Sequence, residues 1–170
     1  AMKVAELLYK DGESIIWSDR IKDFNETGVG KVSIRAVALK MCKKIATKIS
    51  DDLYKTDTKI DAANLTYKII NAYWIAISEV FPEMFSSETG RKYNITKSSQ
   101  AEVMNGVLFR ILEKCEQGGY WENNGAEWNY NTSKATKYKL KPGDTTNPKY
   151  WRKLLEIPLT TFKGEDAEGT

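Results

Sequence analysis

The sequence contains no histidine, only two cysteines and only four prolines among its 170 residues. Without histidine, Ser-His and Cys-His nucleophile pairs, HExxH zinc sites and histidine proton shuttles are excluded. Any catalysis would have to depend on carboxylates, lysine or tyrosine. Cys42 and Cys115 lack CxxC spacing and lie in apolar helical patterns, so we expect reduced cysteines in the core, and no metal site or cofactor.

Long apolar runs are also missing. The longest one, Ala72 to Ile77, is far shorter than the ~20 residues that a membrane span needs, and the N-terminus has no apolar signal region. We therefore expect no membrane contact, and reduced cysteines favour the cytoplasm. Because 41% of the residues are apolar, residues 1–163 can form a single helical domain, and residues 164–170 are expected to form an acidic flexible tail.

Apolar periodicity predicts a mainly α fold, a compact helical domain of three to five helices. The strongest helices are expected over residues 33–50, 60–81 and 98–117, with Ser33 as an N-cap, Asp61 near the start of the second helix and Pro82 ending it. A short helix near residues 4–8, a last helix opened by Pro148, a loop-rich aromatic segment and at most a short hairpin complete the prediction. The expected core surrounds six side chains: Met41, Ile70, Trp74, Ile77, Val107 and Ile111.

The net charge of +3 conceals a segregation of charge along the chain. Residues 31–50 contain six basic residues and no acidic one, and residues 134–163 contain eight basic and two acidic residues. The segment between these blocks and the tail are net acidic. This pattern favours a partner that recognises positive surfaces, or internal pairing between the basic and acidic segments.

The basic blocks supply the candidate nucleic-acid-binding residues. In the first block, lysines fall on the side of the helix opposite its apolar stripe, where they could contact phosphates or pair with flanking acids. In the second, lysines follow aromatic residues that could stack on bases or simply close a small core. The candidates are Lys40, Lys43, Lys44, Lys48, Lys134, Lys137, Lys139, Lys141, Trp128 and Tyr130.

Other motifs have simpler interpretations. The glycine-rich segment 27–33 differs from a P-loop at Asn25 and Val32, where glycine and a hydroxyl residue are required. Asp51, Asp52, Asp57 and Asp61 lack the ligand spacing of a calcium loop and suit helix capping or a solvated loop. Glu79 and Glu83 lie four residues apart, which is weak evidence for carboxylate chemistry. The sequence therefore assigns no catalytic or metal-binding residue.

Several short segments occur together as in a known family. They are 11–14 (Asp-Gly-Glu-Ser) with Ile21, Val32-Ser33, 72–82 with Tyr93, Asn94 and Ile95, and the paired-tryptophan stretch 120–128. In these segments the chain resembles the helical C-terminal part of DGQHR-domain proteins, the DndB-like regulators associated with DNA phosphorothioation. The DGQHR signature is absent and Ile15 replaces the family's proline. The resemblance implies a C-terminal fragment of a bacterial phage-defence or mobile-element protein, and it assigns no functional residue.

These observations favour a non-enzymatic module of a DNA-associated regulatory protein that binds nucleic acid through its basic faces. A protein-interaction or oligomerisation domain without nucleic-acid contact is the first alternative. A metal-dependent hydrolase that uses Asp or Glu is the second.

Overall fold

The structure is a computed structural model, and it is mainly helical, which confirms the predicted fold class. The described residues are 1–23, 25–26, 31–55, 61–85, 95, 97–117, 121–123, 128–130, 145–152 and 154–155. The predicted domain end at 163 and the acidic tail 164–170 lie outside them.

The N-terminal region contains helix α1 (Met2–Lys10) and a small parallel strand pair. Strand β1 (Ile21–Lys22) pairs with β2 (Val32–Ser33), so that Ile21 is opposite Val32. The sequence predicts at most a short hairpin, so the parallel pair differs from the prediction. Strands of two residues are too short to show the alternating pattern by which strands are predicted.

The first predicted helix is continuous from residue 34 to residue 55. It consists of α2 (Ile34–Ala36), the π-helical segment η1 (Val37–Cys42) and α3 (Lys43–Lys55). Ser33 is the N-cap, as predicted, and its hydroxyl oxygen accepts a hydrogen bond from the Ala36 backbone N–H at 3.3 Å. The helix extends five residues beyond its predicted end at residue 50, and the π-helical turn gives it a local change of register.

Helix α4 (Ala62–Val80) is the central element, as predicted. Asp61 caps it by accepting hydrogen bonds from two backbone N–H groups, those of Ala63 at 2.9 Å and Asn64 at 3.2 Å. Helix α4 ends at Val80, close to the predicted end before Pro82. Pro82 itself begins the 3₁₀ helix η2 (Pro82–Phe85). Ile70, Trp74 and Ile77 on this helix are fully buried.

Helix α6 (Ser98–Gln117) has the predicted bounds but a different buried side. Ala101, Asn105, Leu108 and Leu112 face the core, whereas Val107 is 41% exposed and Ile111 is only partly buried. The prediction that Val107 belongs to the core is therefore wrong. The rotation of the helix follows from hydrogen bonds that its buried side makes with α4, described below.

The C-terminal part contributes one hairpin and one helical turn among the described residues. Strands β3 (Trp121–Asn123) and β4 (Trp128–Tyr130) are antiparallel, with Trp121 opposite Tyr130. The turn over residues 148–152 places a fully buried Trp151 against Tyr73 of α4, with a ring separation of 5.6 Å. This agrees with the predicted helix opened by Pro148.

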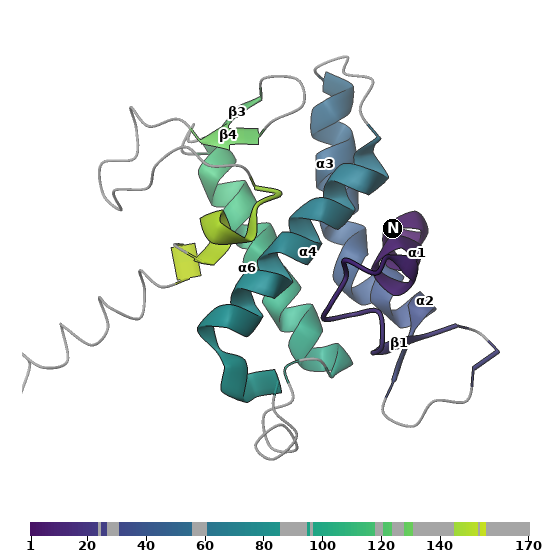
Figure 1. Cartoon of the computed structure of the whole chain (residues 1–170). Helices are drawn as coiled ribbons and strands as arrows, with labels where there is room; N and C mark the ends of the chain where they lie inside the picture. Colours follow the sequence, from purple (N-terminus) through teal and green to yellow (C-terminus); the bar gives the residue numbers. More distant parts are fainter. Residues whose placement is uncertain are drawn as a thin grey trace, which may run out of the picture.

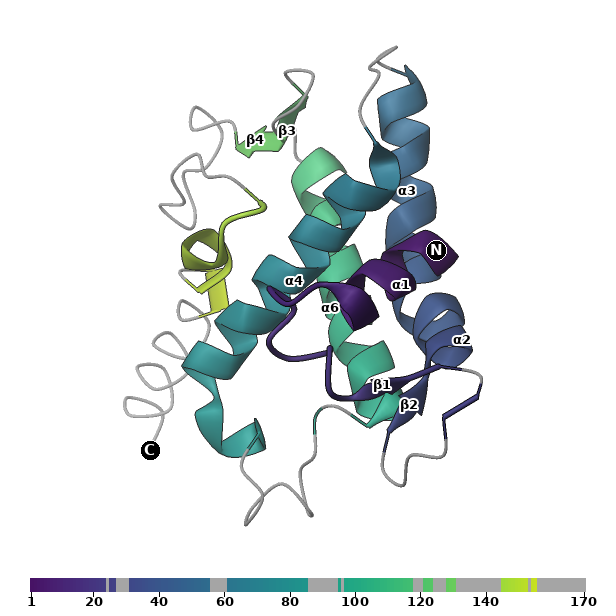
Figure 2. The same ribbon diagram turned by 45° about the vertical axis from the view of Figure 1, so that its right-hand side comes forward.

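Figure 1 shows how these elements surround α4. Helix α4 crosses in front of α6, and α1 and α3 lie on one side of it, whereas the turn 148–152 lies on the other. The view in Figure 2 shows β1 and β2 below α2, at one end of the molecule. Trp74 lies at the centre, in edge-to-face contact with Trp17 at 4.8 Å, Tyr73 at 6.5 Å and Phe85 at 6.4 Å. Such edge-to-face packing suits large buried rings.

Candidate nucleic-acid interface

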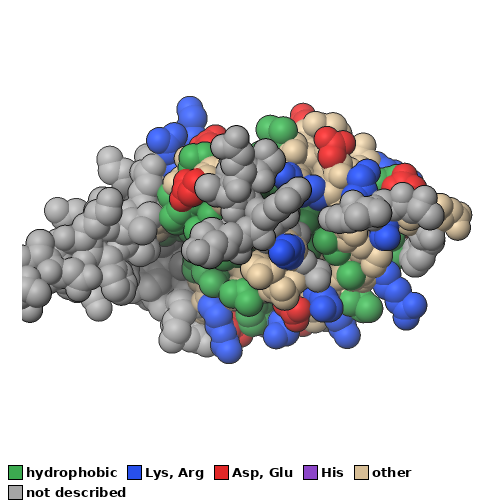
Figure 3. Space-filling view, turned by 90° about the horizontal axis from the view of Figure 1, so that it is seen from below, with side chains coloured by type: hydrophobic (Ala, Val, Ile, Leu, Met, Phe, Trp, Pro, Cys, Tyr) green, Lys and Arg blue, Asp and Glu red, His purple; other side chains and the backbone are tan. Residues whose placement is uncertain are grey.

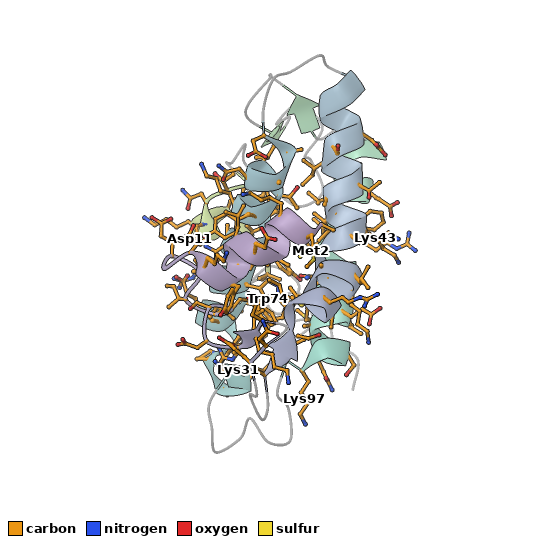
Figure 4. The ribbon with its side chains drawn as sticks, turned by 90° about the vertical axis from the view of Figure 1, so that its right-hand side faces the viewer. Met2, Asp11, Lys31, Lys43, Trp74 and Lys97 are labelled. Atoms are coloured by element: carbon orange, nitrogen blue, oxygen red, sulfur yellow. The ribbon has the colours of Figure 1, made fainter. Side chains whose placement is uncertain are left out.

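The first basic block forms an exposed helix surface. Lys40, Lys43 and Lys44 are all exposed, whereas Met41 and Ile45 on the same helix are buried. We call these three lysines the basic face. Figure 4 shows Lys43 pointing away from the packed helices, while Trp74 lies among them.

The three lysines of the basic face differ in their partners. The ammonium group of Lys40 lies 3.8 Å from a carboxylate oxygen of Glu102 on α6, and both side chains are about half exposed. Among the described residues, no ion pair involves Lys43 or Lys44. The fourth candidate of this block, Lys48, is half-buried and makes its own interaction. In the first block, therefore, three lysines are exposed to solvent and the fourth is half-buried.

Two further residues border the basic face. Arg35 is exposed in the first turn of the helix. Leu39 directly precedes Lys40 and lies one helical turn before Lys43, and 55% of its surface is exposed. The surface is thus basic with one apolar side chain in it.

The lysines proposed in the second basic block are not among the described residues. Lys134, Lys137, Lys139 and Lys141 lie outside the described part of the chain. Trp128 and Tyr130 lie in β4, where the structure describes the backbone pairing alone.

A buried hydrogen-bond chain anchors the segment that carries the basic face, and sequence reasoning missed it. The indole N–H of Trp74 donates to Asn105 Oδ1 at 2.8 Å, and Asn105 Nδ2 donates to the backbone oxygen of Met41 at 3.3 Å. Asn105 is only 2% exposed. Met41 lies in η1, next to Lys40, so this chain ties η1 to both α4 and α6. The sequence signal for this chain is Asn105 itself, a polar residue at helical spacing between the apolar residues Ala101 and Leu108.

A second hydrogen bond also fixes the position of α6. The hydroxyl group of Tyr73 donates to the backbone oxygen of Met104 at 3.0 Å. Two adjacent side chains of α4, Tyr73 and Trp74, therefore reach α6, which explains why its Asn105 side, rather than its Val107 side, faces the core.

Three titratable side chains of the described interior are held in their neutral forms. Burial raises the pKa of the Cys42 thiol to about 12. Burial also raises the pKa of Tyr73, and burial together with the hydrogen bond to Asp11 raises that of Tyr67. A group with a pKa far above neutrality is a poor nucleophile precursor or general base. These three groups are therefore not poised for catalysis near pH 7.

Two of the carboxylates that could suggest metal chemistry have other partners, and a third, Asp57, lies outside the described residues. Glu79 lies 3.8 Å from Arg152 of the C-terminal turn, and Asp61 caps α4. Within the described ranges, no group of three or more Cys, Asp or Glu side chains is arranged to hold a metal ion. No observation thus favours the metal-dependent hydrolase.

A hollow of about 530 Å³ lies where α4, η2 and α6 meet. Most of its lining is apolar, and none of the described side chains that line it is acidic or basic; they are Phe81, Met84, Ile95, Ser99, Gln100, Val103 and Met104. These seven side chains therefore supply no acid–base group.

The side of the molecule seen from below carries charges of both signs (Figure 3). Seen from below in Figure 3, Lys and Arg side chains project along the rim, with acidic side chains interspersed. In the part of the chain that the structure describes, no helix is both long and apolar enough to span a membrane. Comparisons with protein-family models, curated proteins and solved structures found no match.

Proposed function

We propose that this chain is a non-enzymatic helical module of a DNA-associated protein, and that it binds nucleic acid through the basic face of Lys40, Lys43 and Lys44. The observation that supports this most directly is the exposure of all three lysines on a stretch, 31–50, that contains no acidic residue. Exposed ammonium groups can contact phosphates, and such contacts give a sequence-independent affinity that decreases with salt.

Up to residue 50, the charges of this helix are not placed to stabilise it through the helix dipole or through pairs within the helix. Arg35 places a positive charge in the first turn, where the helix dipole favours a negative one. Up to residue 50 the helix also has no acidic residue with which its lysines could form i, i+4 pairs. An external anion is therefore a better reason for this concentration of positive charge than folding is.

Internal pairing with the acidic segments accounts for only part of the basic face. Lys40 pairs with Glu102, but exposed ion pairs of this kind contribute at most about 1 kcal/mol. A phosphate could replace Glu102 at little cost. Lys43 and Lys44 have no such carboxylate among the described residues, so they supply the charge that remains available.

The wider context of the proposal comes from the resemblance to DGQHR-domain regulators. That resemblance supports a DNA-linked role in a bacterial phage-defence or mobile-element protein. A free, buried Cys42 suits the reducing conditions of the cytoplasm.

The proposal is tested by charge reversal on the basic face. The variant combines Lys40→Glu, Lys43→Glu and Lys44→Glu, and its affinity is measured by fluorescence anisotropy on a labelled duplex of about 20 base pairs, in about 50 mM salt. We expect binding at least about tenfold weaker than that of the unchanged chain, and a salt dependence reduced by roughly one unit for each lost phosphate contact. Circular dichroism should show unchanged helix content, since all three side chains are exposed.

The matched control carries the same change of net charge elsewhere. Lys10, Lys68 and Lys149 are exposed on α1, α4 and the C-terminal turn, and their replacement by Glu should weaken binding much less. If the two triple variants lost the same affinity for DNA, net charge alone would explain the loss, and the basic face would have no special role. Undiminished binding of the basic-face variant would refute the proposal.

A further inference from the structure

The π-helical segment η1 (Val37–Cys42) changes how side chains line up along its helix. In a regular α-helix, residues four apart are offset by about 40° around the axis, so a row of them drifts sideways. A π-helical turn contains about one residue more, because its hydrogen bonds span five residues instead of four. Across η1, residues four apart therefore lie almost directly above one another.

On the exposed side, this alignment produces a row in which an apolar residue lies between two cations. Arg35, Leu39 and Lys43 follow one another at intervals of four residues and are all exposed. Lys40 and Lys44 form a second exposed row beside them. Leu39, with 55% of its surface exposed, thus has a positive charge one helical turn away on either side.

The extra residue of the π-helical turn adds surface rather than core. Within η1, Leu39 and Lys40 are exposed, and the other side chains are buried; these are Val37, Ala38, Met41 and Cys42. A regular α-helix already supplies about two buried side chains per turn. π-helical turns are rare and occur frequently at functional sites. The exposed side chains of η1 are therefore candidates for contact with a partner.

We propose that Leu39 is a base-contacting residue of the nucleic-acid interface. When the basic face lies against duplex DNA, Leu39 packs on the 5-methyl group of a thymine in the major groove. This inference rests on the function proposed above, and it adds a contact that is not electrostatic to those of the lysines.

The position of Leu39 among cations favours a groove as the place of this contact. Arg35 and Lys43, on either side of the leucine, are suited to contact phosphates. Between the phosphates of the two strands lies the major groove, which is wide enough for an α-helix. Its apolar group is the thymine methyl, which apolar side chains contact. A leucine in this place is removed from water on binding, and this favours the complex.

Leu39→Ala tests the contact without changing any charge. Anisotropy on an A·T duplex of about 20 base pairs should show an unchanged salt dependence, because every phosphate contact remains. The affinity should fall by about threefold or more, because apolar surface stays in water. Ile15→Ala is the matched control, since Ile15 is 70% exposed but lies between α1 and β1. An unchanged affinity of Leu39→Ala, or an equal loss in Ile15→Ala, would overturn the proposal.

Replacement of thymine by uracil in the DNA tests the chemical group. Uracil pairs with adenine as thymine does, but it lacks the 5-methyl group. In duplexes that alternate adenine with either base, the unchanged chain should bind the thymine duplex about threefold more tightly. Leu39→Ala should bind both duplexes equally. Equal binding by the unchanged chain would refute the thymine contact, and a preference that persists in Leu39→Ala would refute the part of Leu39 in it.

Deletion of Leu39 tests why the helix contains a π-helical turn. Without the extra residue, the segment 34–55 should form a regular α-helix that still exposes Lys40, Lys43 and Lys44. The midpoint of thermal unfolding, followed by circular dichroism, should be at least as high as in the unchanged chain, and the preference for thymine should disappear. An unfolded deletion variant, or one that still prefers thymine, would contradict the idea that the turn presents Leu39.

The charge-reversal variant of the basic face separates this inference from the proposed function. If that triple variant binds duplex DNA more weakly while Leu39→Ala binds as the unchanged chain does, nucleic-acid binding stands and the leucine contact is refuted. If the unchanged chain binds neither duplex at low salt, both proposals are refuted.

Discussion

The hydrogen-bond chain through Asn105 makes a quantitative prediction. Asn105→Ala removes the acceptor of the buried Trp74 indole N–H and the donor to the Met41 backbone oxygen. An unsatisfied buried donor costs about 1–3 kcal/mol, and the second hydrogen bond contributes about 1 kcal/mol. We expect the free energy of unfolding to fall by about 3 kcal/mol, which lowers the unfolding midpoint by roughly 10 °C in a chain of this size.

Urea denaturation, followed by circular dichroism and tryptophan fluorescence, measures this loss. Asn64→Ala is the control, because Asn64 is exposed on α4 and its replacement should change the stability by less than about 0.5 kcal/mol. A double-mutant cycle with Trp74→Phe should give a coupling energy of about 1 kcal/mol or more. Additive effects, or equal effects of the two alanine substitutions, would refute the idea that Asn105 links α4 to η1.

The same variant also bears on the basic face. Met41 lies in η1, directly after Lys40, so removal of its side-chain partner should loosen this turn of the helix. Hydrogen exchange of the backbone amides over residues 37–42 should then be faster in Asn105→Ala than in the unchanged chain. This increase in rate should be larger than the increase over α1. Unchanged exchange would mean that η1 is held by apolar packing alone.

Three further predictions concern single groups. Asp61→Ala should cost about 1 kcal/mol of stability, and Asp61→Asn, which keeps an oxygen acceptor, should cost less in the same urea titration. With Cys115→Ser in place, the thiol of Cys42, whose pKa burial raises to about 12, should react with Ellman's reagent only under unfolding conditions. The backbone N–H of Glu13 lowers the pKa of Asp11; Asp11 therefore stabilises the fold above the pKa that it has in the unfolded chain, and this contribution is lost as the pH falls through its folded pKa. Asp11→Asn should reduce the acid sensitivity of stability, and an unchanged pH profile would contradict this.

The helices could be predicted because their signals are local. Ser33, Asp61 and Pro82 mark ends through capping and steric effects that involve only neighbouring residues. Exposure of Lys40, Lys43 and Lys44 followed from helical periodicity in the same way.

The remaining features depend on contacts between distant segments. Helix α6 is apolar on two sides, and periodicity alone could not decide whether Val107 or the side of Asn105 faces the core. The decision comes from Tyr73 and Trp74, thirty-one positions away from their acceptors on α6. The π-helical turn and the pairing of β1 with β2 likewise have no local signature.

Trp151 has a practical consequence for shortened versions of the chain. Its indole ring is fully buried against Tyr73, its N–H donates to the backbone oxygen of Thr145, and the neighbouring Arg152 pairs with Glu79. A fragment ending at residue 117 would retain all the long helices, yet it would leave one flank of α4 uncovered in water. The shortest stable fragment should therefore extend through Leu154 and Leu155, which also pack against the core, and a fragment ending at residue 117 should unfold at a lower temperature than the full chain.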